Sequence, residues 1–154
     1  MIPLNVLLIY LLRFEKISVK GILNKESFRD YLGLLGLEPG CFLADRIFNA
    51  LDEDNDGVLN YDDFLSYLNI LINGAEREKA ALSFKIIDNE KKGKITYKDI
   101  EDMMIGISNL WNSLTDSEVL PKKEYIDYIF SNFDSRKANE VLFNEYFFMN
   151  SDLI

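Results

Sequence analysis

The chain has 154 residues, of which 48% are hydrophobic and 13% aromatic, which is enough for one compact domain or two small lobes. Its formal net charge is −9, and an acidic surface of that size repels phosphate backbones and anionic lipids, which argues against nucleic-acid and membrane-surface roles. The sequence contains no histidine, so it excludes an imidazole base and every histidine-ligated zinc site.

An apolar run from Leu4 to Leu12 opens the chain. It is shorter than the roughly 20 residues that a membrane helix needs, and charged Arg13, Glu15 and Lys16 follow it instead of a cleavage site. We therefore expect a buried helix here. Residue 2 is isoleucine instead of glycine, so the N-myristoylation pattern is absent and we expect no myristoyl anchor.

A twelve-residue pattern occurs four times along the chain. Residues 52–63 read DEDNDGVLNYDD, with glycine in the sixth place and leucine in the eighth. Residues 16–27 and 88–99, which lie 36 positions before and after, keep the glycine and an apolar eighth residue. Residues 134–145 form the fourth copy, with Asn139 in place of the glycine. A fixed period of this kind indicates a structural repeat.

Apolar side chains at helical spacing lie on both sides of these patterns. After the second copy, for example, they are Phe64, Tyr67, Leu68 and Leu71. Each unit is therefore predicted to be a helix, a loop and a second helix, and helices with one apolar face must pack in pairs. The expected fold is all-α, with two paired lobes at residues 1–73 and 74–154. Gly74 marks the boundary.

The eighth residues of the loops predict how the units pair. Apolar and β-branched residues suit a short antiparallel β-bridge between two loops. We expect Leu23 to lie opposite Leu59, and Ile95 opposite Val141.

The second loop is the predicted metal site. A hard dication needs oxygen ligands, which a loop of this length supplies from positions 1, 3, 5, 7, 9 and 12. A solvated acidic turn is the alternative, and the repeated helical flanks argue against it. Gly57 permits the sharp turn between the ligands. The predicted ligands are Asp52, Asp54, Asp56, the carbonyl of Val58, Asn60 and Asp63.

Asp63 at the last position departs from the glutamate that such loops ordinarily carry. Aspartate is one methylene shorter and reaches an ion less easily with both oxygens. We therefore expect one Ca²⁺ site with a dissociation constant on the order of 10⁻⁶ to 10⁻⁴ M, at which Mg²⁺ competes.

The other three loops are poorer in ligands. The first has Lys16, Ser18, Lys20 and Ser27 at positions 1, 3, 5 and 12, and the fourth has Asp134 and Glu145 at its ends with Arg136 and Ala138 between them. The third keeps Asp88, Glu90, Thr96 and Asp99, but Lys92 stands at its fifth position. We expect the ammonium group of that lysine to compete with an ion.

The repeated helix, loop and helix pattern with its D-x-D-x-D-G loop resembles the EF-hand superfamily over essentially the full chain. The long spacing before the fourth unit, together with ADRIFNALDEDNDGVLNYDDF and ITYKDIEDMMIGI, is similar to the neuronal calcium sensor and calcineurin-B-like branch. The second unit also resembles calaxin-like EF-hand proteins of ciliary outer-arm dynein. The resemblance implies two lobes, a degenerate first hand and a hydrophobic groove for a target helix.

The leading functional prediction is a regulatory or adaptor protein that binds an amphipathic helix of a larger partner. The negative charge favours a basic helix. The single thiol, Cys41, excludes an internal disulfide and favours a reducing compartment, so we expect a cytoplasmic protein, with a ciliary or cytoskeletal location as the narrower alternative. The predicted groove residues are Phe28, Leu32, Tyr67 and Leu71 in the first lobe and Met103, Met104, Ile107 and Trp111 in the second.

Three other functions were weighed. A calcium-insensitive structural subunit of a large assembly, such as a ciliary dynein complex, would fit three weak loops out of four. A calcium buffer would need several good loops. An enzyme would have to use carboxylates such as Asp52 and Asp56 as acid and base, but the loop already employs them and no nucleophile accompanies them, so we do not expect an enzyme.

Overall fold

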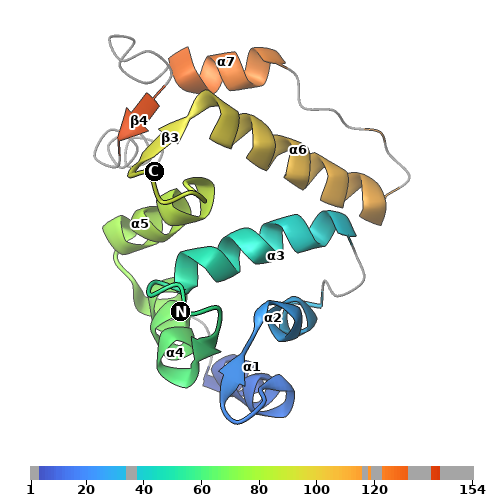
Figure 1. The fold of residues 1–154 in the computed structure, drawn as a ribbon, viewed down its shortest axis with the longest axis vertical. Helices are drawn as coiled ribbons and strands as arrows, with labels where there is room; N and C mark the ends of the chain where they lie inside the picture. Colours follow the sequence, from blue (N-terminus) through green and yellow to red (C-terminus); the bar gives the residue numbers. More distant parts are fainter. Residues whose placement is uncertain (1–3, 34–37, 116–117, 119–122, 132–139, 143–154) are drawn as a thin grey trace. The chain divides into compact units, whose positions relative to one another are not determined.

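The computed structural model describes residues 4–33, 38–115, 118, 123–131 and 140–142. The chain divides into two compact units, Met1–Ala75 and Glu76–Ile154, with helices as the main elements of both (Figure 1). Two short antiparallel strand pairs complete the described structure. This arrangement confirms the predicted all-α fold of helix, loop and helix units.

The described residues of the first unit form four helices and one strand pair. Its elements in chain order are α1 (Leu4–Ile17), β1 (Ile22–Leu23), α2 (Lys25–Tyr31), α3 (Glu38–Leu51), β2 (Leu59–Asn60) and α4 (Tyr61–Asn73). Leu23 lies opposite Leu59 in the strand pair, as the eighth positions of the loops predict. Both leucines are fully buried.

Aromatic rings fill the core of the first unit. Phe64 of α4 packs against Phe14 of α1 at 4.7 Å and against Tyr31 of α2 at 5.0 Å between ring centroids. Phe28 of α2 meets Phe48 of α3 edge-on at 5.7 Å. The core therefore joins all four helices, and each of these four phenylalanines has at most 1% of its surface exposed.

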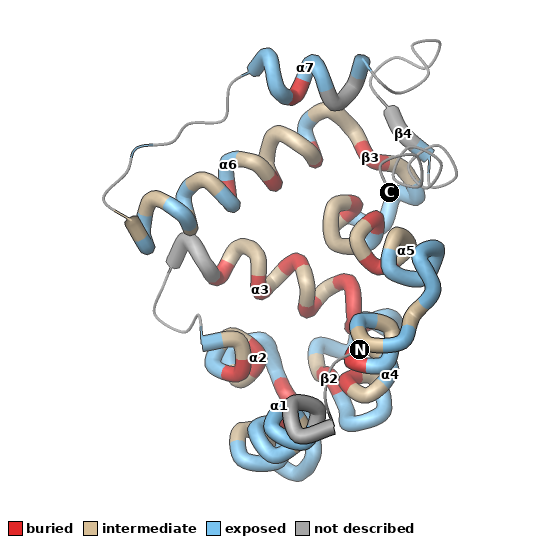
Figure 2. The backbone as a smooth tube through the Cα atoms, turned by 180° about the vertical axis from the view of Figure 1, so that it is seen from behind, coloured by how far each residue is buried: buried red, intermediate tan, exposed pale blue. Residues whose placement is uncertain are grey.

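Helix α1 does not match the prediction of a buried helix. Among residues 8–17, for which burial is described, Leu8, Ile9 and Leu12 are more than half exposed and Phe14 is buried in the core. Most of this part of α1 is coloured as exposed in Figure 2. An apolar run without a polar face carries no periodicity that tells which side packs. The prediction was therefore right about the helix and wrong about its burial.

The second unit repeats the same elements. They are α5 (Glu76–Ile87), β3 (Lys94–Thr96), α6 (Tyr97–Leu114), α7 (Lys123–Ser131) and β4 (Glu140–Leu142). Ile95 lies opposite Val141 in the antiparallel pair of β3 and β4, again as predicted. The helix expected after the fourth loop, at residues 146–153, lies outside the described residues.

Candidate metal centre

The second loop runs from the end of α3 to the start of α4 and begins with Asp52. The Asp52 residue is only 7% exposed. Its Oδ1 accepts a hydrogen bond from the amide of Asp56 at 3.1 Å, and its Oδ2 accepts one from the amide of Gly57 at 3.0 Å. The loop is thus wound around the carboxylate of its own first residue.

Three carboxylates meet inside this turn. Asp52, Asp54 and Asp56 each offer one carboxylate oxygen, and these oxygens all lie within 4.8 Å of one another. Gly57 has a φ of 82°, a left-handed conformation that glycine adopts without strain. The turn at Gly57 therefore redirects the chain directly after the three carboxylates at positions one, three and five.

The last two predicted side-chain ligands form the N-terminal cap of α4. Asn60 accepts hydrogen bonds through Oδ1 from the amides of Asp62 and Asp63, at 2.9 and 3.0 Å. Asp63 in turn accepts one from the amide of Asn60 at 3.1 Å, which completes a capping box. Asp63 is not among the three clustered carboxylates, and the half-buried Val58 follows Gly57 directly.

The carboxylate oxygens of this loop are suitable ligands for a hard divalent cation. Carboxylate oxygens are the ligands that Ca²⁺ and Mg²⁺ prefer. Six acidic residues and no basic residue lie between Asp52 and Asp63. Clustered like charges repel one another, so a bound dication would relieve a repulsion that is already present.

Replacing Asp63 with glutamate should raise the affinity of this loop for Ca²⁺ by about tenfold. A side chain longer by one methylene reaches an ion more easily with both of its oxygens, while a glutamate can still cap α4 through the amide of Asn60. Calorimetric titration of Ca²⁺ measures the change.

The neighbouring Asp62 provides the matched control for this substitution. Asp62 is exposed and lies one residue away, so Asp62→Glu adds the same methylene without moving a predicted ligand. Equal Ca²⁺ affinities for the Asp63→Glu variant and the unmodified protein would contradict the assigned role of position twelve.

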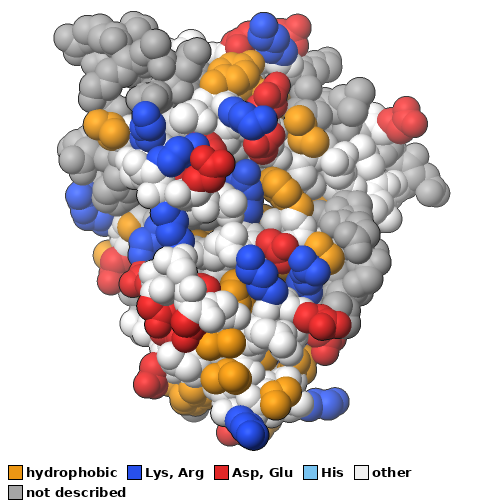
Figure 3. Space-filling model, in the orientation of Figure 1, with side chains coloured by type: hydrophobic (Ala, Val, Ile, Leu, Met, Phe, Trp, Pro, Cys, Tyr) orange, Lys and Arg blue, Asp and Glu red, His pale blue; other side chains and the backbone are white. Residues whose placement is uncertain are grey.

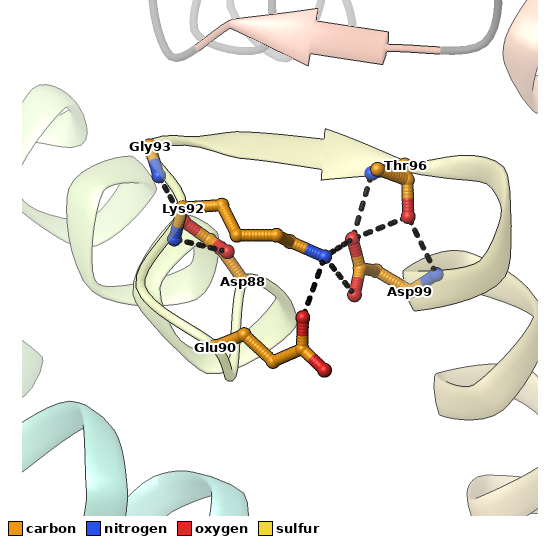
Figure 4. A network of polar contacts seen from close by, with 6 residues as sticks. All are labelled: Asp88, Glu90, Lys92, Gly93, Thr96 and Asp99. Carbon is orange, nitrogen blue, oxygen red and sulfur yellow. Dashed lines mark hydrogen bonds and ion pairs between the residues drawn. The ribbon is translucent and has the colours of Figure 1, made fainter.

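The third loop has the same turn around its first residue. Asp88 accepts hydrogen bonds from the amides of Lys92 at 3.0 Å and Gly93 at 2.7 Å. Gly93 has a φ of 76°, close to that of Gly57. The difference from the second loop lies in the side chain at the fifth position (Figure 4).

The ammonium group of Lys92 lies among the acidic side chains of the third loop. Its Nζ is 3.1 and 3.0 Å from the two carboxylate oxygens of Asp99 and 3.4 Å from Oε2 of Glu90. The hydrogen bond to Asp99 raises the pKa of Lys92. Burial alone would raise the pKa of Asp99, but hydrogen bonds from Thr96 and Lys92 hold it below its usual value.

Helix caps at the loop ends are a regularity beyond the predictions made from the sequence. The ninth residue of each of the first three loops is the N-cap directly before the following helix. These residues, Asn24, Asn60 and Thr96, each accept a hydrogen bond from the amide three residues later. The sequence does carry the signal, because asparagine or threonine before a helical stripe is a helix start.

The first and fourth loops are predicted from their sequences to hold no ion. The first has no carboxylate at positions 1, 3, 5 or 12, although its strand pairs with the second loop. In the fourth loop, Asp134, Arg136, Ala138 and Glu145 lie outside the described residues.

The predicted groove residues differ in exposure. Phe28 and Met103 are buried within their own units, because the helical stripes that carry them supply the cores, and they are not available to a partner in this conformation. Leu32, Tyr67 and Met104 are half-buried. Leu71, Ile107 and Trp111 are exposed, and Trp111 is 55% exposed.

The fold and the two loops define a class of protein built from paired helix, loop and helix metal-binding units. Comparison with known families agrees with this, because the EF-hand domain pair matches residues 40–105 and 77–149. The chain belongs to the EF-hand domain-pair family. None of the described helices is both long enough and apolar enough to cross a bilayer.

Similar proteins come from several kinds of organism. The chain is 36% identical over 76 residues to a phosphatidylinositol 4-phosphate 5-kinase of Plasmodium falciparum, covering 49% of this chain and 4% of the kinase. It is 27% identical over 92 residues to the calcium-binding protein NCSA of Dictyostelium discoideum, covering 60% and 49%. It is 29% identical over 116 residues to calcineurin B-like protein 5 of Arabidopsis thaliana, covering 75% and 54%.

These alignments span at most about half the length of the three relatives. The names of two of them support the predicted resemblance to calcium sensors and calcineurin-B-like proteins. The kinase is matched over only 4% of its length, so its activity as a whole is not carried over to this chain.

Proposed function

We propose that the protein is a calcium-responsive regulator or adaptor with one competent metal loop, residues 52–63. The observation that carries this proposal is the meeting of three carboxylates in the second loop, where the third loop holds a lysine instead. When bound, Ca²⁺ would supply positive charge and tie positions distant in the loop together, with Mg²⁺ as its competitor. Asp52, Asp54 and Asp56 would hold the ion.

The partner that we propose is an amphipathic, basic helix of a larger protein in a cytoplasmic compartment. Large apolar side chains remain exposed on α6 in the second unit, namely Ile105, Ile107, Trp111 and Leu114. In the first unit, hydrophobic side chains reach the surface in the lower part of Figure 3, where Figure 1 labels α1. Apolar helix surfaces of this kind suit the apolar face of a target helix.

A labelled peptide helix with leucine on one face and lysine on the other tests this function. We expect the fluorescence anisotropy of the peptide to rise when it binds. Its affinity should be at least about tenfold higher in Ca²⁺ than in chelator, because bound metal should change the conformation of the first unit. Trp111 is the single tryptophan, so a blue shift of its emission reports whether the second unit takes part.

The same peptide with glutamate in place of lysine is the control for charge, and it should bind more weakly. A calcium-insensitive structural subunit is the second candidate function. It is favoured by the lysine at the fifth position of the third loop and by the lack of a carboxylate at positions 1, 3, 5 and 12 of the first loop. Equal affinities in Ca²⁺ and chelator would support that candidate over the regulator, and the absence of binding in both would contradict the helix partner.

A further inference from the structure

The third loop has the shape of a metal loop but not its charge. Its first residue, Asp88, is wrapped by backbone amides in the same way as Asp52 in the second loop. Its fourth and sixth residues, Lys91 and Gly93, have φ values of 54° and 76°, against 58° and 82° for Asn55 and Gly57. The backbone of the third loop thus has the same conformation at these positions as the backbone of the second loop, the candidate metal centre.

The side chains of the third loop already contain a cation. Residues 88–99 carry three carboxylates and four lysines, whereas residues 52–63 carry six carboxylates and no basic residue. The Nζ of Lys92 contacts both oxygens of Asp99, the last loop position, and Oε2 of Glu90, the third position (Figure 4). These are two of the groups on which a dication in this loop would depend.

A dication does not fit the third loop in this arrangement. It would have to take the oxygens of Asp99 from an ammonium group that donates to them at 3.0 and 3.1 Å, and it would then be repelled by that ammonium. Asp99 is largely buried and also accepts hydrogen bonds from the amide and hydroxyl of Thr96, at 2.8 and 2.6 Å. Its carboxylate is therefore already satisfied.

We propose that the ammonium group of Lys92 is the built-in cation of the third loop. It takes the place of the dication, links the third and twelfth positions and keeps the loop closed at every metal concentration. The second unit then keeps the same conformation with and without metal. The statement that metal responses are confined to the first unit rests on the proposed function, whereas the statement about Lys92 does not.

Two substitutions of Lys92 separate its charge from its position. Lys92→Met removes the ammonium and supplies no oxygen, while Lys92→Asn removes the ammonium and supplies a ligand oxygen at the fifth position. Exposed Lys98, which has the same charge in the first turn of α6, gives the control Lys98→Asn. The full chain is used for calorimetric Ca²⁺ titration and for thermal melting in chelator.

We expect Lys92→Asn to bind one more Ca²⁺ than the unmodified protein, and Lys92→Met to bind no more than it. Both variants should melt about 2–4 °C lower in chelator at low salt, because a charge-assisted contact of a partly exposed pair is lost. The difference should shrink in high salt, which screens the pair. Lys98→Asn should change neither the stoichiometry nor the melting temperature.

Two results would overturn the inference. One is a Lys92→Met variant that melts at the same temperature as the unmodified protein in chelator. The other is a Glu90→Gln variant that binds one Ca²⁺ fewer than the unmodified protein, since the third loop would then hold an ion despite Lys92. If the unmodified protein binds no Ca²⁺ at all, the proposed function fails, yet Lys92→Asn should still gain one ion.

Discussion

Replacing Asp52 with asparagine should strongly weaken metal binding at the second loop and destabilise the first unit at the same time. The substitution removes one of three clustered charges, and we expect the Ca²⁺ affinity to fall by about a hundredfold or more. It also places an amide nitrogen beside the backbone amides of Asp56 or Gly57, which donate to the carboxylate of Asp52. A buried donor without an acceptor costs about 1–3 kcal/mol.

Asp54 offers the matched comparison, because it is exposed and accepts one longer hydrogen bond, from the amide of Asp56 at 3.3 Å. We expect Asp54→Asn to lower the Ca²⁺ affinity by about tenfold, with unchanged or slightly raised stability in chelator, since it relieves repulsion within the cluster. Calorimetry and chemical unfolding in chelator measure the two effects. Unchanged Ca²⁺ affinity in both variants would contradict the metal site.

Spacing was sufficient to predict the loops and their pairing. The period of 36 residues aligns Leu23 with Leu59, and the pairing of neighbouring loops follows because two single units cannot bury their apolar stripes alone. The twelve-residue pattern also singles out Asp52, Asp54 and Asp56. In the folded loop, their carboxylate oxygens lie within 4.8 Å of one another. These features depend on backbone geometry, which a short pattern with a glycine largely determines.

Other features depend on rotamers and on which faces finally pack, and spacing does not encode these. The sequence marked Lys92 as a competitor for the ion, but not as a hydrogen-bond donor to both oxygens of Asp99. Phe28 belongs to the apolar stripe that suggested a groove, yet its ring packs in the core against Phe48. A stripe of apolar residues shows that a face is covered without showing by what.

Replacing Phe64 with alanine should lower the free energy of unfolding of the first unit by about 3–5 kcal/mol. The ring is fully buried and lies 4.7 Å from Phe14, 5.0 Å from Tyr31 and 6.5 Å from Tyr67, so its removal leaves a cavity between three helices. Chemical unfolding in chelator, followed by circular dichroism, measures the loss. A loss below about 1 kcal/mol would contradict the described core.

Calcium should restore part of this loss, because Phe64 directly follows Asp63 and the metal loop exists only when the first unit is folded. An excess of free Ca²⁺ of about a hundred times the dissociation constant adds about 2.7 kcal/mol to the folded form. Phe84→Ala removes a buried ring from the second unit and is the matched control. With a lysine as the cation of its third loop, that unit should lose stability equally in Ca²⁺ and in chelator, so rescue of Phe84→Ala by Ca²⁺ would place a second ion there.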